Sequence, residues 1–373
     1  MAISNSIAHP IATLRNAIRR LRRSDFDTST ESGRNDERHQ RALVNAAAAI
    51  VAKIATVIAN LVVIPMVLNH LGAERFGVWA TVTSFVMLLS FTDLGIGNGL
   101  MTAVSHASGR SDATELRRLA TAGMLSTGTI GMLVVATSVI AYAVVPWPQW
   151  LNVSGDAAIE VAPAIAVLGV CLGIAMPAGV ATRIEAGLQR GFVSSAIQVA
   201  GAFLGLAMTV IALRLKAGLP WLVGASVGAP VLAMMANSVS FFYWRRPDLR
   251  PTHAGYSPSA LRSLMRIGML FFALQLSLAL GMWTDNIIIS RLLGPAAVTQ
   301  YSIPARLYGL ISMVVIMATG PLWPAYGEAV ARGDHAWARR TLAATMKLSI
   351  VGAAGAAIPV SYTHLTLPTN REV

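Results

Sequence analysis

The sequence predicts an all-α, polytopic membrane helix bundle in which a block of helices occurs twice. Of the 373 residues, 55% are apolar and only 12% are charged, whereas a soluble domain carries about 25% charged residues. The apolar runs are continuous rather than alternating, and about 20 such residues span a bilayer as a helix. Leu71-Gly72 also recurs later in the chain as Leu293-Gly294, and an apolar repeat of several helices is typical of transporters.

Residues 1–41 are predicted to form a polar, basic tail on the cytoplasmic side, without the features of a cleavable signal peptide. Apolar residues between Ile11 and Leu21 recur at three- and four-residue steps among several arginines. This pattern predicts a short amphipathic helix on an anionic membrane surface, and the alternative is a solvated tail that only obeys the topology rules. Residues 24–41 are expected to be disordered.

Nine apolar stretches follow the tail, and each is long enough to cross a bilayer. In chain order they are 42–69, 77–104, 119–145, 157–181, 192–213, 219–243, 264–290, 298–323 and 340–360. The hydrophilic segment 244–263 divides them into a first lobe of six helices, residues 42–243, and a partial second lobe of three, residues 264–360.

The distribution of Lys and Arg predicts the orientation of these spans. With the N-terminus inside the cell, the cytoplasmic segments hold 21 Lys and Arg residues and the outside segments hold four, as the positive-inside rule requires. The same rule accounts for the net charge of +12. The charge is therefore no reason to expect nucleic acid as a partner.

The repeat predicts how the two lobes relate. The offset that places Gly72 on Gly294 also aligns Arg110-x-Asp112 with Arg332-x-Asp334, and residues 71–124 share thirteen identities with their counterparts. It places the first three spans on the last three, so both copies cross the membrane in the same direction and a six-plus-six parallel repeat is implied. Residues 361–373 resemble translated sequencing-adapter read-through, the alternative being a natural tail. We therefore expect the natural protein to be longer.

Three segments carry a family resemblance: Leu71 to Ala80 after the first span, Asp93 to Gly99 in the second, and Ala329 to Arg340 after the eighth. Together they resemble the polysaccharide flippases of the Wzx type, in the multidrug/oligosaccharidyl-lipid/polysaccharide exporter superfamily. The resemblance covers about residues 42–360. It implies 12–14 helices in two six-helix lobes around a central cavity, movement of lipid-linked sugars to the outer leaflet, and coupling to a proton or sodium ion. The chain departs from it by having about nine spans.

Ionisable and amide groups inside the spans are candidates for substrate binding or coupling. Lys53 and Asn60 lie on a similar face of the first span, and the repeat places Lys53 opposite Gln275. Facing a central cavity, Lys53 could attract the pyrophosphate of a polyprenyl carrier. The alternative is that Lys53 extends to the cytoplasmic surface.

A second group lies in the seventh and eighth spans. Asp285, Asn286 and Arg306 are polar residues in apolar surroundings, and an ion pair between Asp285 and Arg306 is predicted. Such a pair serves either to neutralise two buried charges or as a gate that opens when Asp285 is protonated.

The run from Asp93 to Gly99 combines a carboxylate, Asn98 and three alternate glycines. It predicts either a helix that loosens so that Asp93 faces the cavity or caps a broken turn, or close helix packing through Gly95 and Gly99. Asn98 can hydrogen-bond across helices in both cases.

Arg183 to Arg190 is predicted to form a cytoplasmic connection that anchors a loop or meets a lipid headgroup. The sequence shows no hydrolase or Walker motif, its single cysteine, Cys171, allows no internal disulfide, and its histidines lack metal-ligand spacing. We therefore predict a protein that is not an enzyme and needs no cofactor or metal.

These observations predict a flippase of the bacterial inner membrane for a polyprenyl-pyrophosphate-linked oligosaccharide, serving O-antigen (lipopolysaccharide), capsule or exopolysaccharide assembly by alternating access. Its expected partners are the lipid-linked oligosaccharide, membrane lipids, and polysaccharide polymerase and chain-length proteins. The alternatives are a drug/cation exporter of the same superfamily, a membrane-embedded polymerase or ligase, and a scaffold without transport activity.

Overall fold

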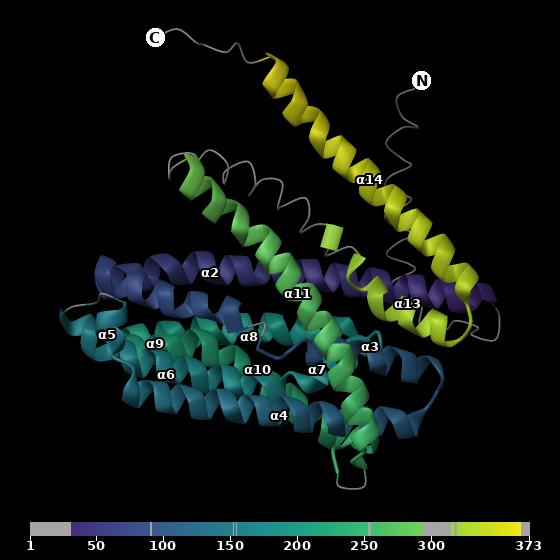
Figure 1. Cartoon of the computed structure of the whole chain (residues 1–373), viewed down its shortest axis with the longest axis horizontal. Coiled ribbons are helices and arrows are strands. Elements are labelled where there is room, and N and C mark those ends of the chain that lie inside the picture. The colour runs from purple at the N-terminus through teal and green to yellow at the C-terminus, as the bar shows by residue number, and fades with distance from the viewer. Residues whose placement is uncertain are drawn as a thin grey trace.

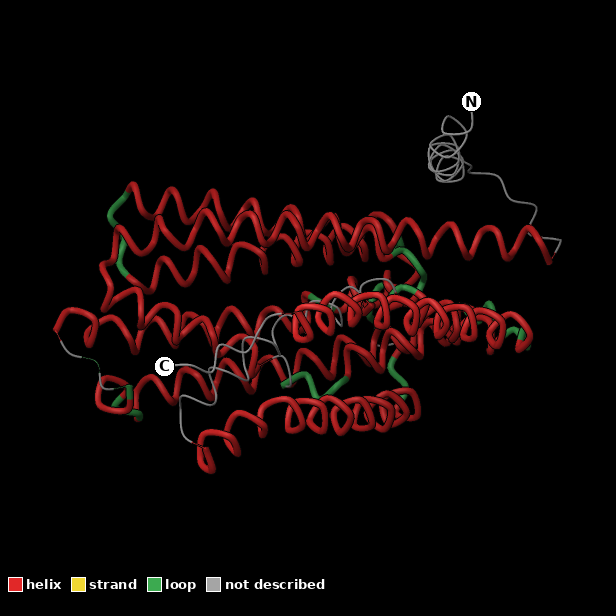
Figure 2. The backbone as a smooth tube through the Cα atoms, turned by 90° about the horizontal axis from the view of Figure 1, so that it is seen from above, coloured by secondary structure: helices red, strands yellow, loops and turns green. Residues whose placement is uncertain are grey.

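Long helices form the framework of the chain, as the continuous apolar runs predict. A computed structural model describes residues 31–366 except 90–91, 152, 154, 253–254, 294–314 and 317–318. Figures 1 and 2 show the long helices running lengthwise beside one another. In chain order the helices are α2 (Glu31–Leu89), α3 (Ile96–Gly109), α4 (Ala113–Val144), α5 (Trp147–Trp150), α6 (Gly155–Ala178), α7 (Val180–Gly187), α8 (Gly191–Arg214), α9 (Leu219–Val223), η1 (Gly224–Gly228), α10 (Ala229–Ser240), η2 (Phe241–Arg245), η3 (Pro247–Leu249), α11 (Pro258–Leu293), α13 (Leu322–Ala331) and α14 (His335–Thr366).

Six of these helical segments are long and apolar enough to cross a membrane, among the residues described. They are Gln40–Gly72, Ala113–Val144, Ala157–Gly187, Gly191–Arg214, Leu219–Arg245 and Pro258–Leu278. They match the predicted first and third to seventh spans, so the chain is a polytopic helical membrane protein. The predicted ninth span lies within α14, and most of the eighth lies outside the described residues.

The predicted span 77–104 is interrupted at Asp93, as one of the two alternatives for the run from Asp93 to Gly99 expected. Helix α2 ends at Leu89, Thr92 to Gly95 form a turn, and α3 begins at Ile96. Leu94 and Gly95 have φ angles of 50° and 70°, a left-handed conformation that cannot continue a right-handed helix. The chain also turns back at Gly72 inside α2, where φ is 75° and ψ is 169° (Figure 1).

The predicted disorder of residues 24–41 is wrong for its described part, because α2 begins at Glu31. Extending an existing helix costs far less than nucleating a new one, and Arg41 pairs with Glu37 one turn earlier at 2.5 Å. Residues 1–30, with the predicted amphipathic helix, and residues 367–373 lie outside the described part of the chain.

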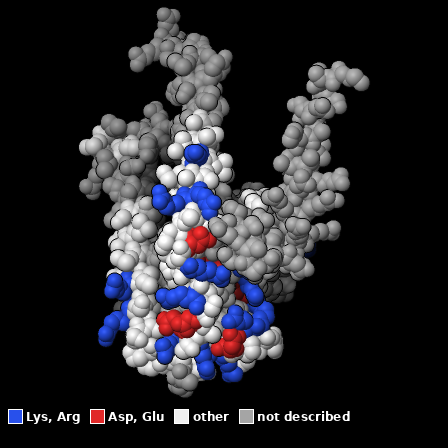
Figure 3. Space-filling model, turned by 90° about the vertical axis from the view of Figure 1, so that its right-hand side faces the viewer, with Lys and Arg blue, Asp and Glu red and all other residues white. Residues whose placement is uncertain are grey.

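The bundle has a basic end, which we define by the exposed arginines at the ends of α3 and α13, the starts of α4 and α8, and the loop after η3. Figure 3 looks onto this end and shows its Lys and Arg side chains gathered there. The arginines are Arg110, Arg118, Arg190, Arg250 and Arg332.

Two apolar cores lie along the length of the bundle. The core nearer the basic end includes Ile96, Ile184 and Phe241, and it also takes in Leu264 of α11. The other core, toward the opposite end, joins α2 to α6 and α9 through Val67, Val161, Leu219 and their neighbours. Helix α11 therefore shares a core with the first six spans near the basic end, and Figure 1 shows its other end leaving the bundle.

Candidate functional site

The break between α2 and α3 is held by the side chain of Asp93. Its Oδ1 accepts a hydrogen bond from the Gly95 N–H at 2.9 Å, and its Oδ2 accepts one from the Gly97 N–H at 3.3 Å. The first N–H groups of a helix otherwise lack partners, and a negative charge is stabilised at that end of the helix dipole. Asp93 therefore caps α3, and the helix dipole offsets part of its charge.

Arg183 of α7 lies against the first turn of α3. Its Nη1 donates a hydrogen bond to Asn98 Oδ1 at 3.2 Å. A methyl group on Gly97 would lie 2.8 Å from Arg183 Nε and 2.9 Å from Asp93 Oδ2. The absence of a side chain at position 97 thus allows Arg183 to approach α3. The guanidinium is exposed and has five N–H donors, of which one bonds Asn98 among the described residues.

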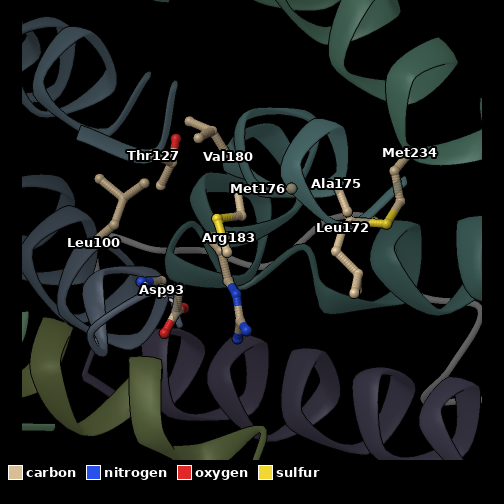
Figure 4. Close-up of a pocket in the computed structure, with 11 residues that line it drawn as sticks. Asp93, Leu100, Thr127, Leu172, Ala175, Met176, Val180, Arg183 and Met234 are labelled. Atoms are coloured by element: carbon tan, nitrogen blue, oxygen red, sulfur yellow. Dashed lines mark hydrogen bonds between the residues drawn. The ribbon is translucent and has the colours of Figure 1, made fainter. Parts of the chain in front are cut away.

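Both charged residues line a cavity of about 260 Å³ between α3, α4, α6, α7 and α10. Figure 4 shows Asp93 and Arg183 among the lining residues, with Met176 beside Arg183 and with Leu172 and Met234 farther to the right. An apolar pocket with a few convergent polar groups is the usual form of a ligand site. This arrangement can hold an amphiphile whose anionic group meets Arg183.

A buried ion pair fixes α7, the helix that carries Arg183. Glu185 is only 1% exposed and pairs with Arg245, and it also accepts a hydrogen bond from Asn237 Nδ2 at 3.0 Å. Arg245 Nη2 in turn donates to Asn237 Oδ1 at 2.6 Å. Removing Arg245 would therefore leave the buried carboxylate of Glu185 without its ionic partner. Glu185 is an anchor for the segment Arg183 to Arg190.

The two lobes are joined near the basic end by contacts of α13 with α3 and with the connection between α7 and α8. Gln189 Nε2 donates a hydrogen bond to Glu328 of α13, and both side chains are buried. Trp323 Nε1 also donates to Thr102 Oγ1 at 3.1 Å. These bonds hold the lobes together at the basic end of the bundle.

The loops after α3 and α13 occupy equivalent positions in the two copies of the repeat and have the same local geometry. Arg110 and Arg332 have φ angles of −87° and −88°, both with ψ of 0°. Asp112 Oδ1 caps α4 through the Glu115 N–H at 2.9 Å, and Asp334 Oδ1 caps α14 through the Trp337 N–H at 3.2 Å. The internal repeat therefore extends to the three-dimensional structure of these loops.

Residues 42–330 match the family of polysaccharide biosynthesis proteins. The chain belongs to this family. No protein of curated function matches the sequence.

The fold is that of MATE transporters in the MOP superfamily. The structure resembles an outward-facing multidrug resistance MATE transporter with a TM-score of 0.66 at 17% identity, over 89% of this chain and 73% of the other. A MOP superfamily transporter from Pyrococcus furiosus, described as having a binding pocket of reverse polarity, gives the same TM-score of 0.66, identity of 17% and coverage of 89% and 73%. A MATE transporter in a bent conformation gives a TM-score of 0.71 at 16% identity, over 90% of this chain and 72% of the other.

By its family the chain is a polysaccharide biosynthesis protein, and its fold is that of transporters of the MOP superfamily. The predicted resemblance to Wzx-type exporters is confirmed at this level. The alternative of a membrane-embedded polymerase or ligase has no support from the comparisons.

The structure of this polysaccharide biosynthesis protein brings together only part of the predicted site. Asp93 and Asn98 lie together at Arg183. Lys53 and Asn60 lie on the exposed face of α2, and within the described residues neither forms a hydrogen bond or an ion pair. Thr56, one turn from Lys53, lines a second cavity of about 450 Å³ between α2, α7, α8 and α10.

The remaining candidates belong to the second lobe. Gln275 is half-buried on α11 and lines none of the cavities described here. Asp285 and Asn286 belong to α11, but their side chains lie outside the described residues, as does the whole of Arg306. Their roles in binding or coupling stay predictions.

Sequence reasoning missed Arg183 as a site residue because it treated the residue as part of a loop. The fourth apolar segment runs on through α7, so Arg183 lies within a helix rather than after it. The available signal was Glu185, since an acidic residue at the end of an apolar run needs a buried partner.

Proposed function

We propose that this exporter flips a polyprenyl-pyrophosphate-linked oligosaccharide across the bacterial inner membrane, for O-antigen, capsule or exopolysaccharide assembly. The observation that carries the proposal is the exposed guanidinium of Arg183 in the cavity at the break before α3. Arginine matches phosphate oxygens with a planar fork of N–H donors. The apolar wall formed by Leu172, Met176 and Met234 suits the lipid part of such a substrate.

The charges in the cavity favour an anionic substrate over a cationic drug. The two carboxylate oxygens of Asp93 are both engaged by backbone N–H groups of α3. Within the described residues, the Arg183 side chain has one hydrogen bond, to neutral Asn98. An organic cation would therefore meet an unpaired positive charge, which costs binding energy.

The contacts between the lobes support alternating access. They lie near the basic end, which we assign to the cytoplasm by the positive-inside rule, with the N-terminus on that side. A closed cytoplasmic end is the state that releases cargo to the outer leaflet. The flipped lipid-linked sugar then serves polymerase and chain-length proteins, and coupling to protons or sodium ions drives the cycle.

The test uses the purified chain in proteoliposomes with a fluorescent polyprenyl-pyrophosphate oligosaccharide, and it follows protection of the dye from a membrane-impermeant quencher. Replacing Arg183 by Gln should lower the flipping rate about tenfold or more, because a hydrogen bond to a charged group contributes about 1.5–3 kcal/mol. Arg183→Lys should retain part of the rate. The control is Arg118→Gln, which removes the same charge from the surface of α4 and should have no effect.

Two results would contradict the proposal. One is a wild-type chain that flips no lipid-linked oligosaccharide while it exports an organic cation dye. The other is an Arg183→Gln variant that flips at the wild-type rate.

A further inference from the structure

A separate basic pocket lies between α2 and the start of α8. It has a volume of about 240 Å³, and its polar lining includes Arg41, Asn45, Gln189 and Arg190. None of these residues lines the cavity that holds Arg183. The volume far exceeds the roughly 10–15 Å³ that a single water molecule needs, so the pocket can hold a larger polar group.

Asn45 makes the floor of this pocket rigid. Its Nδ2 donates a hydrogen bond to the Gln189 carbonyl oxygen at 3.0 Å, and its Oδ1 accepts one from the Phe192 N–H at 2.8 Å. Asn45 is buried, and α2 and α8 are thereby joined at a fixed distance. These bonds fix the backbone on both sides of Arg190 and do not involve a charged group.

The positive charges of the pocket remain available to a ligand. The exposed side chain of Arg190 makes no hydrogen bond or ion pair with the residues that the structure describes. Arg41 pairs with Glu37, but both groups are partly exposed, and such surface pairs are weak. Among the described residues no carboxylate lines the pocket itself. The nearest ones are Glu37, paired with Arg41, and Glu328, which accepts a hydrogen bond from the Gln189 side chain. An anion that reaches it would meet two guanidinium groups.

The start of α8 adds to this positive potential. This 24-residue helix begins at Gly191, directly after Arg190, whose own side chain does not cap it. In the first turn, the neutral side chain of Asn45 accepts the Phe192 N–H and adds no negative charge there. The partial positive charge at a helix N-terminus favours anions, phosphate in particular. The helix dipole of α8 and the two arginines therefore both make the potential in the pocket more positive.

Apolar side chains stand at the mouth of the pocket. Phe192, which lines it, is 46% exposed, and Leu43 on the neighbouring turn of α2 is 56% exposed. Exposed apolar groups beside a basic site at the end of a membrane span are suited to acyl chains rather than to water. The combination favours a phosphate attached to a lipid over a phosphate in solution.

We propose that this pocket binds the phosphate of an anionic phospholipid in the leaflet at the basic end, at a site distinct from the transport cavity. Arg41 and Arg190 hold the phosphate oxygens, the N-terminus of α8 faces the same charge, and Phe192 contacts the lipid chains. The bound lipid is a resident of the protein and is not the cargo.

Native mass spectrometry of the full chain tests this site, with retained phosphatidylglycerol and phosphatidylcholine counted at defined lipid concentrations. The wild-type chain should retain one phosphatidylglycerol with an affinity at least tenfold above that for phosphatidylcholine. The double variant Arg41→Gln/Arg190→Gln should lose about 30-fold in that affinity, since each arginine near the membrane surface contributes about fivefold. The matched control is Arg118→Gln/Arg339→Gln, which removes two exposed charges from the same end and should change the affinity less than twofold.

Other arms separate the sources of phosphate and the two sites. Inorganic phosphate at equal concentration should leave the bound lipid in place, and Arg183→Gln should not alter retention. The proposal is overturned if the control variant loses as much lipid as the pocket variant, if inorganic phosphate displaces the lipid, or if Arg183→Gln abolishes retention. If size-exclusion chromatography shows the double variant to be aggregated, Arg190→Gln alone should still lose about fivefold.

Discussion

Ser105 of α3 and Gly327 of α13 occupy equivalent positions in the two copies of the repeat, and they lie against each other in the structure. A Cβ atom on Gly327 would stand 3.2 Å from the Cβ of Ser105. The next equivalent pair repeats the relationship, because a Cβ atom on Gly109 would lie 2.8 Å from the Cβ of Ala331. Helices α3 and α13 thus cross at matching positions of the repeat.

This crossing predicts a disulfide between the lobes. Bridged cysteines have Cβ atoms about 3.5–4.5 Å apart, so Ser105→Cys and Gly327→Cys need a shift of only a few tenths of an ångström. In a Cys171→Ser background, mild oxidation should link the pair, and peptide mass spectrometry should detect the linked peptides until a reductant is added. A Gly77→Cys/Gly327→Cys control should not link, and equal linking in both would contradict the crossing.

The hydrogen bond between Gln189 and Glu328 is expected to keep the basic end closed. Replacing Glu328 by Ala removes a buried bond to a charged group, worth about 1.5–3 kcal/mol, which corresponds to a roughly 10- to 150-fold change in the ratio of closed to open molecules. Pulsed electron spin resonance between labels at the exposed positions 114 and 336 should then show a longer distance. Gln189→Ala should act in the same direction.

Glu115→Ala provides the control for that experiment. Glu115 lies at the same end but forms only an exposed pair with Arg118 at 3.9 Å, so its loss should leave the distance distribution unchanged. An unchanged distribution for Glu328→Ala would show that the closed end does not depend on this bond.

Gly95 cannot be replaced without loss of stability. Its φ of 70° disfavours any side chain, and a methyl group there would lie 2.7 Å from the Phe272 backbone nitrogen on α11. Gly95→Ala should therefore lower the free energy of unfolding by more than about 1 kcal/mol, measured by thermal unfolding in detergent. Gly77 is helical with open space around it, so Gly77→Ala should be neutral or stabilising by up to about 1 kcal/mol.

His106 predicts a loss of stability in mild acid. It lies on α3 beyond the predicted span, and burial, followed by the charge of Arg110, lowers its pKa from the usual 6.5. As the pH falls below 6.5, the unfolded chain binds the proton before the folded chain, so the folded state loses free energy until its own pKa is reached. Thermal unfolding between pH 7.5 and 5 should show a smaller drop for His106→Gln than for the wild type. A parallel drop would exclude His106 as the source.

The sequence predicted the spans well because hydropathy alone determines which segments enter a bilayer. Within residues 77–104 it left a broken turn at Asp93 and close packing through Gly95 and Gly99 as alternatives. The structure shows the break, because the backbone conformation of Leu94 and Gly95 ends the helix although the apolar run continues. Hydropathy carries no information about φ angles, so the glycines around Asp93 were the only sign of the break.

The repeat predicted equivalence between lobes but not contact between them. The constant offset between the two copies identified the paired loops at Arg110 and Arg332, since identical residues favour identical turns. Contacts such as Gln189 to Glu328 depend on how the lobes dock, which local patterns do not encode. For the same reason, sequence reasoning chose Lys53 for the cavity, whereas the structure places Arg183 there.

The crossing of α3 and α13 has the form of an isologous interface, in which a position meets its own counterpart across a twofold axis. Two separate copies of one polypeptide make such contacts when they form a symmetric dimer. A gene that was duplicated and fused would inherit them within a single chain, and each early substitution would have changed both sides of the interface at once. The pair of serine and glycine at positions 105 and 327 then records how the two halves diverged after fusion, when each side could change alone.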